Sequence, residues 1–226
     1  MRMLLIVCAV TVGLAATSAA GQYNVDFSST TGDGSGAPGS SYGAAAGQAG
    51  FWNNVTDQSA AGLALLDIGG VSSGVTLSLT AGGFMFDASN SNPNGIITPT
   101  GSDDALLMDS VWDPPAGSMT IGNLPAGMYN LYVYGGSPDS ATTFMQFDVG
   151  AATELVGGQW SDPFTFQEGI THAHFLVDHA GGDLVIGIPD VAGFESVNGF
   201  QLSPIPEPGA LGLAGLAGLA LLRRRR

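Results

Sequence analysis

Alternation of apolar and polar residues is the clearest pattern in the central part of the chain. Near its start, Tyr23, Val25 and Phe27 alternate with Asn24 and Asp26. A period of two predicts a strand with one buried face and one solvent-facing face. Similar runs predict nine further strands, at residues 63–68, 75–80, 84–87, 118–121, 128–134, 142–149, 170–178, 184–188 and 197–202. About ten short strands are typical of an all-β sandwich.

Glycine and proline mark the turns between these strands. The chain has 35 glycines among 226 residues, about twice the average usage. Turn signals stand at residues 94–95, 125–127, 135–139 and 181–183, and residues 32–50 predict a long mobile loop. Residues 102–108 predict a short helical turn, with Ser102 as its N-cap. We therefore expect a single jelly-roll-like β-sandwich domain over residues 21–203.

The N-terminus has the pattern of an export signal. Arg2 precedes an apolar run at residues 4–14 and a small-residue stretch at 15–21. This predicts a signal peptide at residues 1–20, removed by signal peptidase near Ala20. The single cysteine, Cys8, lies inside that peptide. The mature protein would then have neither a disulfide nor a thiol nucleophile.

The C-terminus is also set apart from the sandwich. Pro206-Glu207-Pro208 precedes an uncharged run at residues 209–222, and four arginines follow it, Arg223, Arg224, Arg225 and Arg226. As a helix this run is about 21 Å long, short of a hydrocarbon core about 30 Å thick. We expect a short transmembrane helix with the arginines on the cytoplasmic side.

The tail at residues 204–226 resembles the PEP-CTERM sorting signal of Gram-negative bacteria. The resemblance implies an exported protein whose precursor is anchored transiently in the inner membrane. It implies processing by an exosortase near Pro206, Glu207 and Pro208, followed by placement at the cell surface or outside the cell.

Charge is distributed very unevenly. All five basic residues, Arg2 and Arg223 to Arg226, lie in the two terminal segments. Of the nineteen acidic residues only Glu207 lies outside residues 21–205, which leaves eighteen carboxylates and no Lys or Arg in that body. Nucleic acid is excluded as a direct partner, because phosphate contacts need cationic side chains. Charge of one sign also favours solubility and discourages self-association.

A second resemblance covers most of the body. The stretch at residues 124–135, Leu-Pro-Ala-Gly followed by a tyrosine-rich strand, is similar to bacterial jelly-roll modules related to galactose-binding-like domains. Residues 51–54 and 197–202 resemble other segments of those secreted modules. Many of them bind carbohydrate, but that function does not follow from the fold alone.

Two groups of residues suggest metal ligands. His172 and His174 share one strand face and could ligate zinc, the alternative being a solvated strand face. The densest acidic group comprises Asp103, Asp104, Asp109 and Asp113. It could hold calcium in a loop, with Asp103, Asp104 and Asp109 as the candidate ligands, the alternative being solvated charge. We assign no cofactor, with Ca²⁺ as the open candidate.

Aromatic residues give the best ligand hypothesis. If Tyr129, Leu131 and Val133 point inward, Tyr132 and Tyr134 lie on the outer sheet face. With Trp112 or Trp160 they could form a platform on which sugar rings stack. The alternatives are cross-strand packing that only stabilises the sheet, or cover from a long loop.

No pattern predicts catalysis. Carboxylate pairs occur by chance in so acidic a chain, and glycoside hydrolysis needs two at a defined separation. Residues 70–74 fit a nucleophile-elbow expression, but a strand at 75–80 follows them where that motif requires a helix. We expect a non-enzymatic structural protein of the cell surface or an exopolysaccharide matrix. The alternatives are a carbohydrate-binding module and, less favoured, a polysaccharide-active enzyme.

Overall fold

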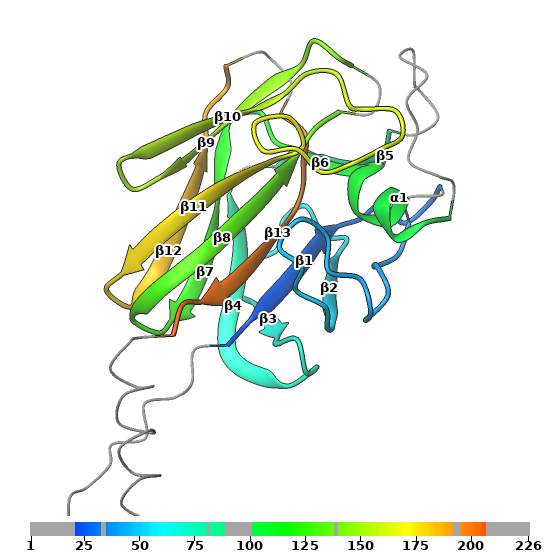
Figure 1. Cartoon of the computed structure of the whole chain (residues 1–226). Helices are drawn as coiled ribbons and strands as arrows, with labels where there is room; N and C mark the ends of the chain where they lie inside the picture. The colour runs from blue at the N-terminus through cyan, green and yellow to red at the C-terminus, as the bar shows by residue number, and fades with distance from the viewer. Residues whose placement is uncertain are drawn as a thin grey trace, which may run out of the picture.

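The protein folds into two β-sheets packed face to face (Figure 1). The computed structural model describes residues 21–32, 35–80, 82–88, 101–137, 140–191 and 195–206. The predicted signal peptide, the turn at 94–95, the apolar run at 209–222 and the terminal arginines lie outside these residues. Among the described residues no helix is long and apolar enough to cross a membrane.

The larger sheet has seven strands. They are β1 (Tyr23–Phe27), β2 (Trp52–Val55), β5 (Phe84–Asp87), β6 (Ser110–Asp113), β8 (Gly127–Gly135), β11 (His172–His179) and β13 (Val197–Pro204). Five of them run in the order β11-β8-β13-β1-β2, while β6 pairs with the start of β13 and with β5. The β1–β2 pair is parallel and the others are antiparallel.

The smaller sheet has six antiparallel strands. They are β3 (Leu63–Leu66), β4 (Ser72–Thr80), β7 (Gly117–Leu124), β9 (Phe144–Val149), β10 (Ala152–Gly157) and β12 (Gly182–Ile188), in the order β10-β9-β12-β7-β4-β3. The predicted turns at 125–127 and 181–183 carry the chain from one sheet to the other, between β7 and β8 and between β11 and β12. The all-β sandwich prediction is therefore confirmed.

The main core lies between the sheets, and the predicted inward residues form it. Tyr23, Val25 and Phe27 of β1 are fully buried, as are Tyr129, Leu131 and Val133 of β8. On β11 the inward set is Ala173, Phe175 and Val177. Alternation places these side chains on one face because successive side chains of a strand point to opposite sides.

On one side of the sandwich, the Asn53 side chain links the two sheets by hydrogen bonds. Asn53 of β2 accepts a hydrogen bond from Leu66 N at 2.8 Å and donates to Leu66 O at 2.8 Å and Asn24 O at 3.0 Å. These bonds tie the edge of the larger sheet to β3, the edge of the smaller one. On the opposite side the outermost strands are β10 and β11.

All ten predicted strands are present, and three more are found at β2, β6 and β10. The first two are four residues long, and β10 exposes its first four residues, so none shows a clear alternation. The short helix is confirmed as α1 (Asp103–Met108), where Ser102 Oγ accepts a hydrogen bond from Ala105 N at 3.1 Å.

A third layer covers part of the outer face of the larger sheet. It consists of α1 and the chain segments 35–50 and 158–170. Their apolar side chains form a second cluster with outward residues of the sheet, comprising Trp52, Leu107, Met108, Tyr134 and Trp160, with Ala37, Tyr42, Ala44, Ala45, Tyr132, Phe164, Phe166 and Ile170 packed against them. The segment expected to be a mobile loop is therefore packed on the sheet over its described residues 35–50.

Candidate functional site

The sorting segment begins where the sandwich ends. Strand β13 runs to Pro204, and Ile205 N still donates to Met128 O at 2.7 Å. Pro206 is the last residue described at this end, and Glu207, Pro208 and Arg223 to Arg226 lie beyond it. Since Tyr23 pairs with Leu202, the described chain enters and leaves at the same end of the sandwich (Figure 1).

The outer face of the larger sheet falls into two parts. We call the part beneath the third layer the covered half; it includes Asn24, Tyr134 and Gln201, all of which are buried. The remainder, formed by the outward residues of β8 and β11, is the open half; it includes Met128, Asn130, Tyr132, His174 and Leu176. Both halves contain residues that alternation alone places toward solvent.

Tyr134 belongs to the covered half and is fully buried. Its hydroxyl donates to Gln201 Oε1 at 2.5 Å and accepts from Ala45 N at 3.0 Å. Its ring meets Phe166 edge-on at 5.5 Å, and desolvation raises its pKa. The prediction of an exposed Tyr134 is wrong, because the segments 35–50 and 158–170 cover it.

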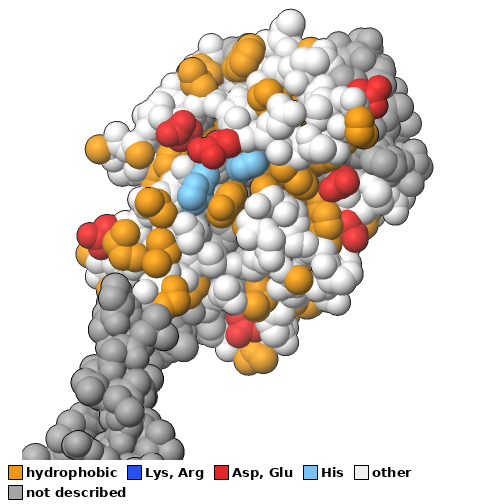
Figure 2. Space-filling model, in the orientation of Figure 1, with side chains coloured by type: hydrophobic (Ala, Val, Ile, Leu, Met, Phe, Trp, Pro, Cys, Tyr) orange, Lys and Arg blue, Asp and Glu red, His pale blue; other side chains and the backbone are white. Residues whose placement is uncertain are grey.

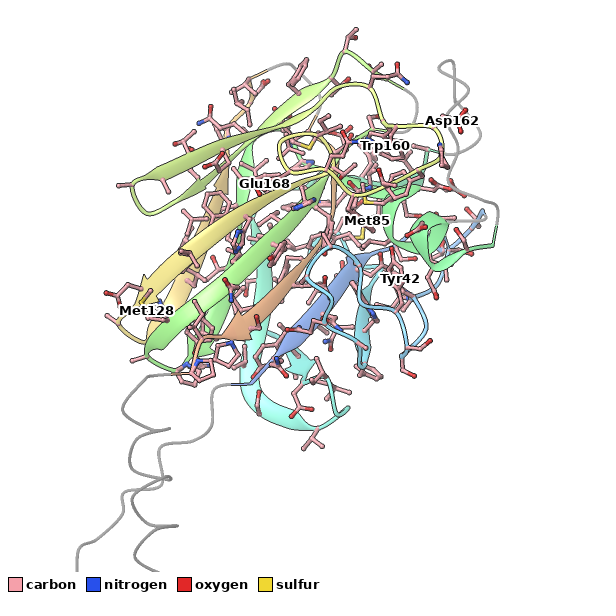
Figure 3. All side chains as sticks on the ribbon, in the orientation of Figure 1. Tyr42, Met85, Met128, Trp160, Asp162 and Glu168 are labelled. Carbon is pink, nitrogen blue, oxygen red and sulfur yellow. The ribbon has the colours of Figure 1, made fainter. Side chains whose placement is uncertain are left out.

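The two tryptophans proposed for the glycan platform are also buried. Trp160 belongs to the third layer (Figure 3), where it is buried with its ring centroid 5.4 Å from that of Phe164. Trp112 is fully buried in the core between the sheets, with its ring 5.6 Å from Phe27. Neither ring is available for stacking on a sugar, so this part of the prediction is wrong.

Tyr132 is the member of the predicted platform that retains exposure. Its ring stacks on His174, with centroids 4.4 Å apart and planes inclined by 19°. His174 Nε2 lies 3.1 Å from Asn130 Oδ1. The open half therefore presents a stacked aromatic pair beside an amide, and Figure 2 shows histidine side chains on this face with acidic side chains nearby.

His172 lies at the boundary between the two halves. It is largely buried, 5.7 Å from Tyr132 and 6.0 Å from Tyr134 between ring centroids. Burial lowers its pKa, and the Glu168 carboxylate opposes that effect. The chain places Glu168 beside it through a bridge between the two backbones.

The aspartates proposed as calcium ligands hold the third layer in place. Asp103 Oδ1 accepts from Gly39 N at 2.7 Å, and Asp104 Oδ1 accepts from the Tyr42 hydroxyl at 2.5 Å. Asp109 is the buried C-cap of α1. Among the described residues, no three His, Cys, Asp or Glu side chains are grouped so that they could hold a metal ion.

Sequence reasoning missed a buried polar network under the third layer. Gln48 Nε2 donates to Asn24 Oδ1 at 2.7 Å, and Gln201 Nε2 donates to the same atom at 2.9 Å. Asn24 Nδ2 and Gln201 Nε2 both donate to Gln48 O at 3.1 Å. The alternation of β1 marks Asn24 as outward, but only the loop that carries Gln48 buries it.

Asp26 of β1 is the second missed residue. It is fully buried, and neither carboxyl oxygen has a hydrogen-bond partner among the described residues. Burial therefore raises its pKa well above the usual range, because ionisation without a partner in a dry environment is costly. This group favours the protonated, neutral form.

Comparison with known proteins identifies the tail. Residues 204–226 match the PEP-CTERM protein-sorting motif. The motif marks an exported protein that passes through the membrane and is processed by an exosortase. No curated protein matches the sequence.

Solved structures give only partial superpositions. A calcium-binding mutant of Bacteroides uniformis beta-glucuronidase 2 has 12% identity and a TM-score of 0.41, covering 61% of this chain and 16% of that one. A ruminal GH26 endo-beta-1,4-mannanase has 10% identity and a TM-score of 0.29, with coverages of 56% and 26%. The Podospora anserina GH26-CBM35 beta-(1,4)-mannanase has 14% identity and a TM-score of 0.26, with coverages of 55% and 28%. The chain thus spans about a quarter or less of the first two proteins.

Proposed function

We propose that this exported chain is a non-enzymatic structural protein of the cell surface or exopolysaccharide matrix of a Gram-negative bacterium. Signal peptidase would remove residues 1–20, and an exosortase would cut near Pro206-Glu207-Pro208. The working protein would then be the acidic sandwich, with extracellular polysaccharide as its surroundings.

The observation that carries this proposal is the position of the motif relative to the fold. Over the described part of the chain, the last backbone hydrogen bond of the sandwich is made by Ile205, one residue before Pro206. Cleavage at the motif would therefore leave every described strand intact. It would also remove Arg223 to Arg226, so that the product carries no Lys or Arg once the signal peptide is gone.

Intact mass of the native protein tests the sorting step. We expect Glu207→Ala to leave unprocessed chain in the inner membrane, whereas Glu154→Ala, which removes an exposed carboxylate on β10, is processed like the parent. A Glu207→Ala protein with the parent's mature mass would overturn the proposal.

Carbohydrate contact is the second candidate, and the Tyr132–His174 stack favours it. An aromatic face can stack on a sugar ring, and the Asn130 amide beside it can bond hydroxyls. On a glycan array, Tyr132→Ala should lose any binding shown by the parent, while Phe144→Ala, which removes an exposed aromatic on β9, should retain it. Absence of binding by the parent would eliminate this candidate. Turnover of a polysaccharide, lost when one carboxylate is neutralised, would favour an enzyme instead.

A further inference from the structure

Strand β11 forms an open edge of the larger sheet. It pairs along its full length with β8. On its other side, among the described residues, the only backbone bridge is between Glu168 and His172. Beyond His172 no described strand pairs with this side.

Hydrogen bonds at the start of β11 show which backbone groups face outward. Thr171 O accepts from Gly135 N at 3.1 Å on the β8 side, and His172 O accepts from Gly169 N at 2.9 Å on the other side. In an antiparallel ladder these directions alternate. The N–H and C=O groups of His174, Leu176 and Asp178 therefore point away from β8, and such an edge is a template for another strand.

The side chains of these three residues are complementary to themselves. If two copies of β11 pair antiparallel about Leu176, the two Leu176 side chains face each other. His174 of each copy then faces Asp178 of the other, on the same sheet face. A histidine N–H can donate to an aspartate oxygen, and complementary side chains in directly facing positions stabilise a strand pair.

The residues at the centre of this edge are exposed. Leu176 is 67% exposed, and Asp178 is exposed beside it. A cleft of about 280 Å³ runs along this stretch of β11, between the strand and the turn at residues 149–152. His174 Nε2 contacts Asn130, which leaves Nδ1 for a partner across the edge.

Net charge opposes association of two copies, but β11 carries histidines as well as an aspartate. The three histidines of the chain, His172, His174 and His179, all lie on β11, and the body has no Lys or Arg. Repulsion between the remaining carboxylates is screened beyond about 8 Å at physiological ionic strength. Pairing through this edge places imidazoles as well as carboxylates between the two acidic bodies.

We propose that the protein forms a two-fold symmetric dimer through antiparallel β11–β11 pairing centred on Leu176. The larger sheets of the two copies then join into one, with β2-β1-β13-β8-β11 contributed by each copy. This inference concerns the partner of the sheet edge and does not depend on carbohydrate contact or on the sorting step.

A charge exchange tests the pairing register. Sedimentation of the full-length chain in mild detergent should show a dimer for the parent and monomers for His174→Asp and for Asp178→His, because each change places two like groups opposite each other. An equimolar mixture of the two variants should recover the dimer, since each aspartate then faces a histidine. A mixture that stays monomeric beside a dimeric parent, or a parent that is itself monomeric, would overturn the proposal. An unchanged far-UV circular dichroism spectrum of both variants serves as the folding control, because loss of the dimer itself lowers the thermal unfolding temperature.

Cross-linking provides a second measurement. Directly opposite residues that exchange two hydrogen bonds have Cα atoms about 5.5 Å apart, which suits a disulfide. In a Cys8→Ser background, Leu176→Cys should oxidise to a covalent dimer. Leu155 is 56% exposed on β10, an edge strand of the smaller sheet, so Leu155→Cys is the matched control and should stay monomeric. Equal cross-linking of the two variants would contradict the β11 interface.

Discussion

Tyr132 and Tyr134 stand two residues apart on one face of one strand, yet they belong to different environments. Tyr134, in the covered half, is fully buried and hydrogen-bonded to Gln201 and Ala45. Tyr132, in the open half, stacks on His174 and keeps part of its surface exposed. Both side chains project from the same face of β8. The difference comes from chain segments far away in sequence, which bury Tyr134 completely and leave Tyr132 partly buried at the margin of the same cluster.

The largest difference should appear when each tyrosine is truncated. Tyr134→Ala removes a fully buried aromatic side chain and the hydroxyl that donates to Gln201 Oε1. We expect the free energy of unfolding to fall by about 3–5 kcal/mol, measured by urea denaturation. A loss close to that of an exposed residue would show that the third layer contributes little to stability.

Asp26, buried on β1 two residues after Asn24, should make the free energy of unfolding depend on pH. Its pKa is raised in the folded state, so folding retains a proton that the unfolded chain releases above about pH 3.9. The stabilisation of the folded state that results is fully present below that pH. It is lost as pH rises toward the folded pKa, by about 1.4 kcal/mol of unfolding free energy per pH unit. Asp26→Asn should therefore flatten the fall in stability with rising pH.

Urea denaturation over a pH series checks this prediction. Asp57→Asn, which removes an exposed carboxyl, is the matched control and should keep the parent's slope. If Asp26→Asn also keeps that slope, Asp26 does not retain its proton in the folded state.

Substitution of Ser102, the N-cap of α1, tests how much this helix of the third layer contributes to the free energy of unfolding. Ser102→Ala removes the acceptor for Ala105 N and should cost about 1 kcal/mol. Ser102→Asp supplies another capping oxygen and should stay near the parent. Thermal unfolding measures both, and a loss equal in the two variants would point to a role of Ser102 other than capping.

The open half should give the smallest effect. Tyr132→Ala removes a partly exposed side chain, and we expect a change in unfolding free energy of about 0.5 kcal/mol. A loss approaching that of Tyr134→Ala would mean that the two halves contribute equally, and that the stack with His174 is mainly structural.

Local patterns predicted the strands well because alternation reports which face is buried by the opposite sheet. The set Tyr129, Leu131 and Val133 was identified correctly for that reason. The same rule failed for Tyr134, because it cannot tell an outward residue in water from one beneath a loop. It also missed β10, whose first four residues are exposed and show no alternation.

The candidate site was predicted in part for a related reason. Tyr132 and His174 were each placed correctly on an outward face, but their stacking depends on the register of β11 against β8, which sets His174 opposite Tyr132. The ties from Asp103 and Asp104 to the loop at 35–50 could not be foreseen, because their partners lie more than sixty residues away.

By itself the sequence determined the all-β class, the absence of Lys and Arg from the body and the sorting tail, since each depends on composition or on residues adjacent in the chain. Only the tertiary structure decided which outward residues are buried, that Asp26 is among them, and which strand lies at the edge of the larger sheet over the described residues. Those properties depend on contacts between distant segments. Which residues are buried and which strands pair depends on how loops and sheets pack together, and a local sequence pattern cannot predict that.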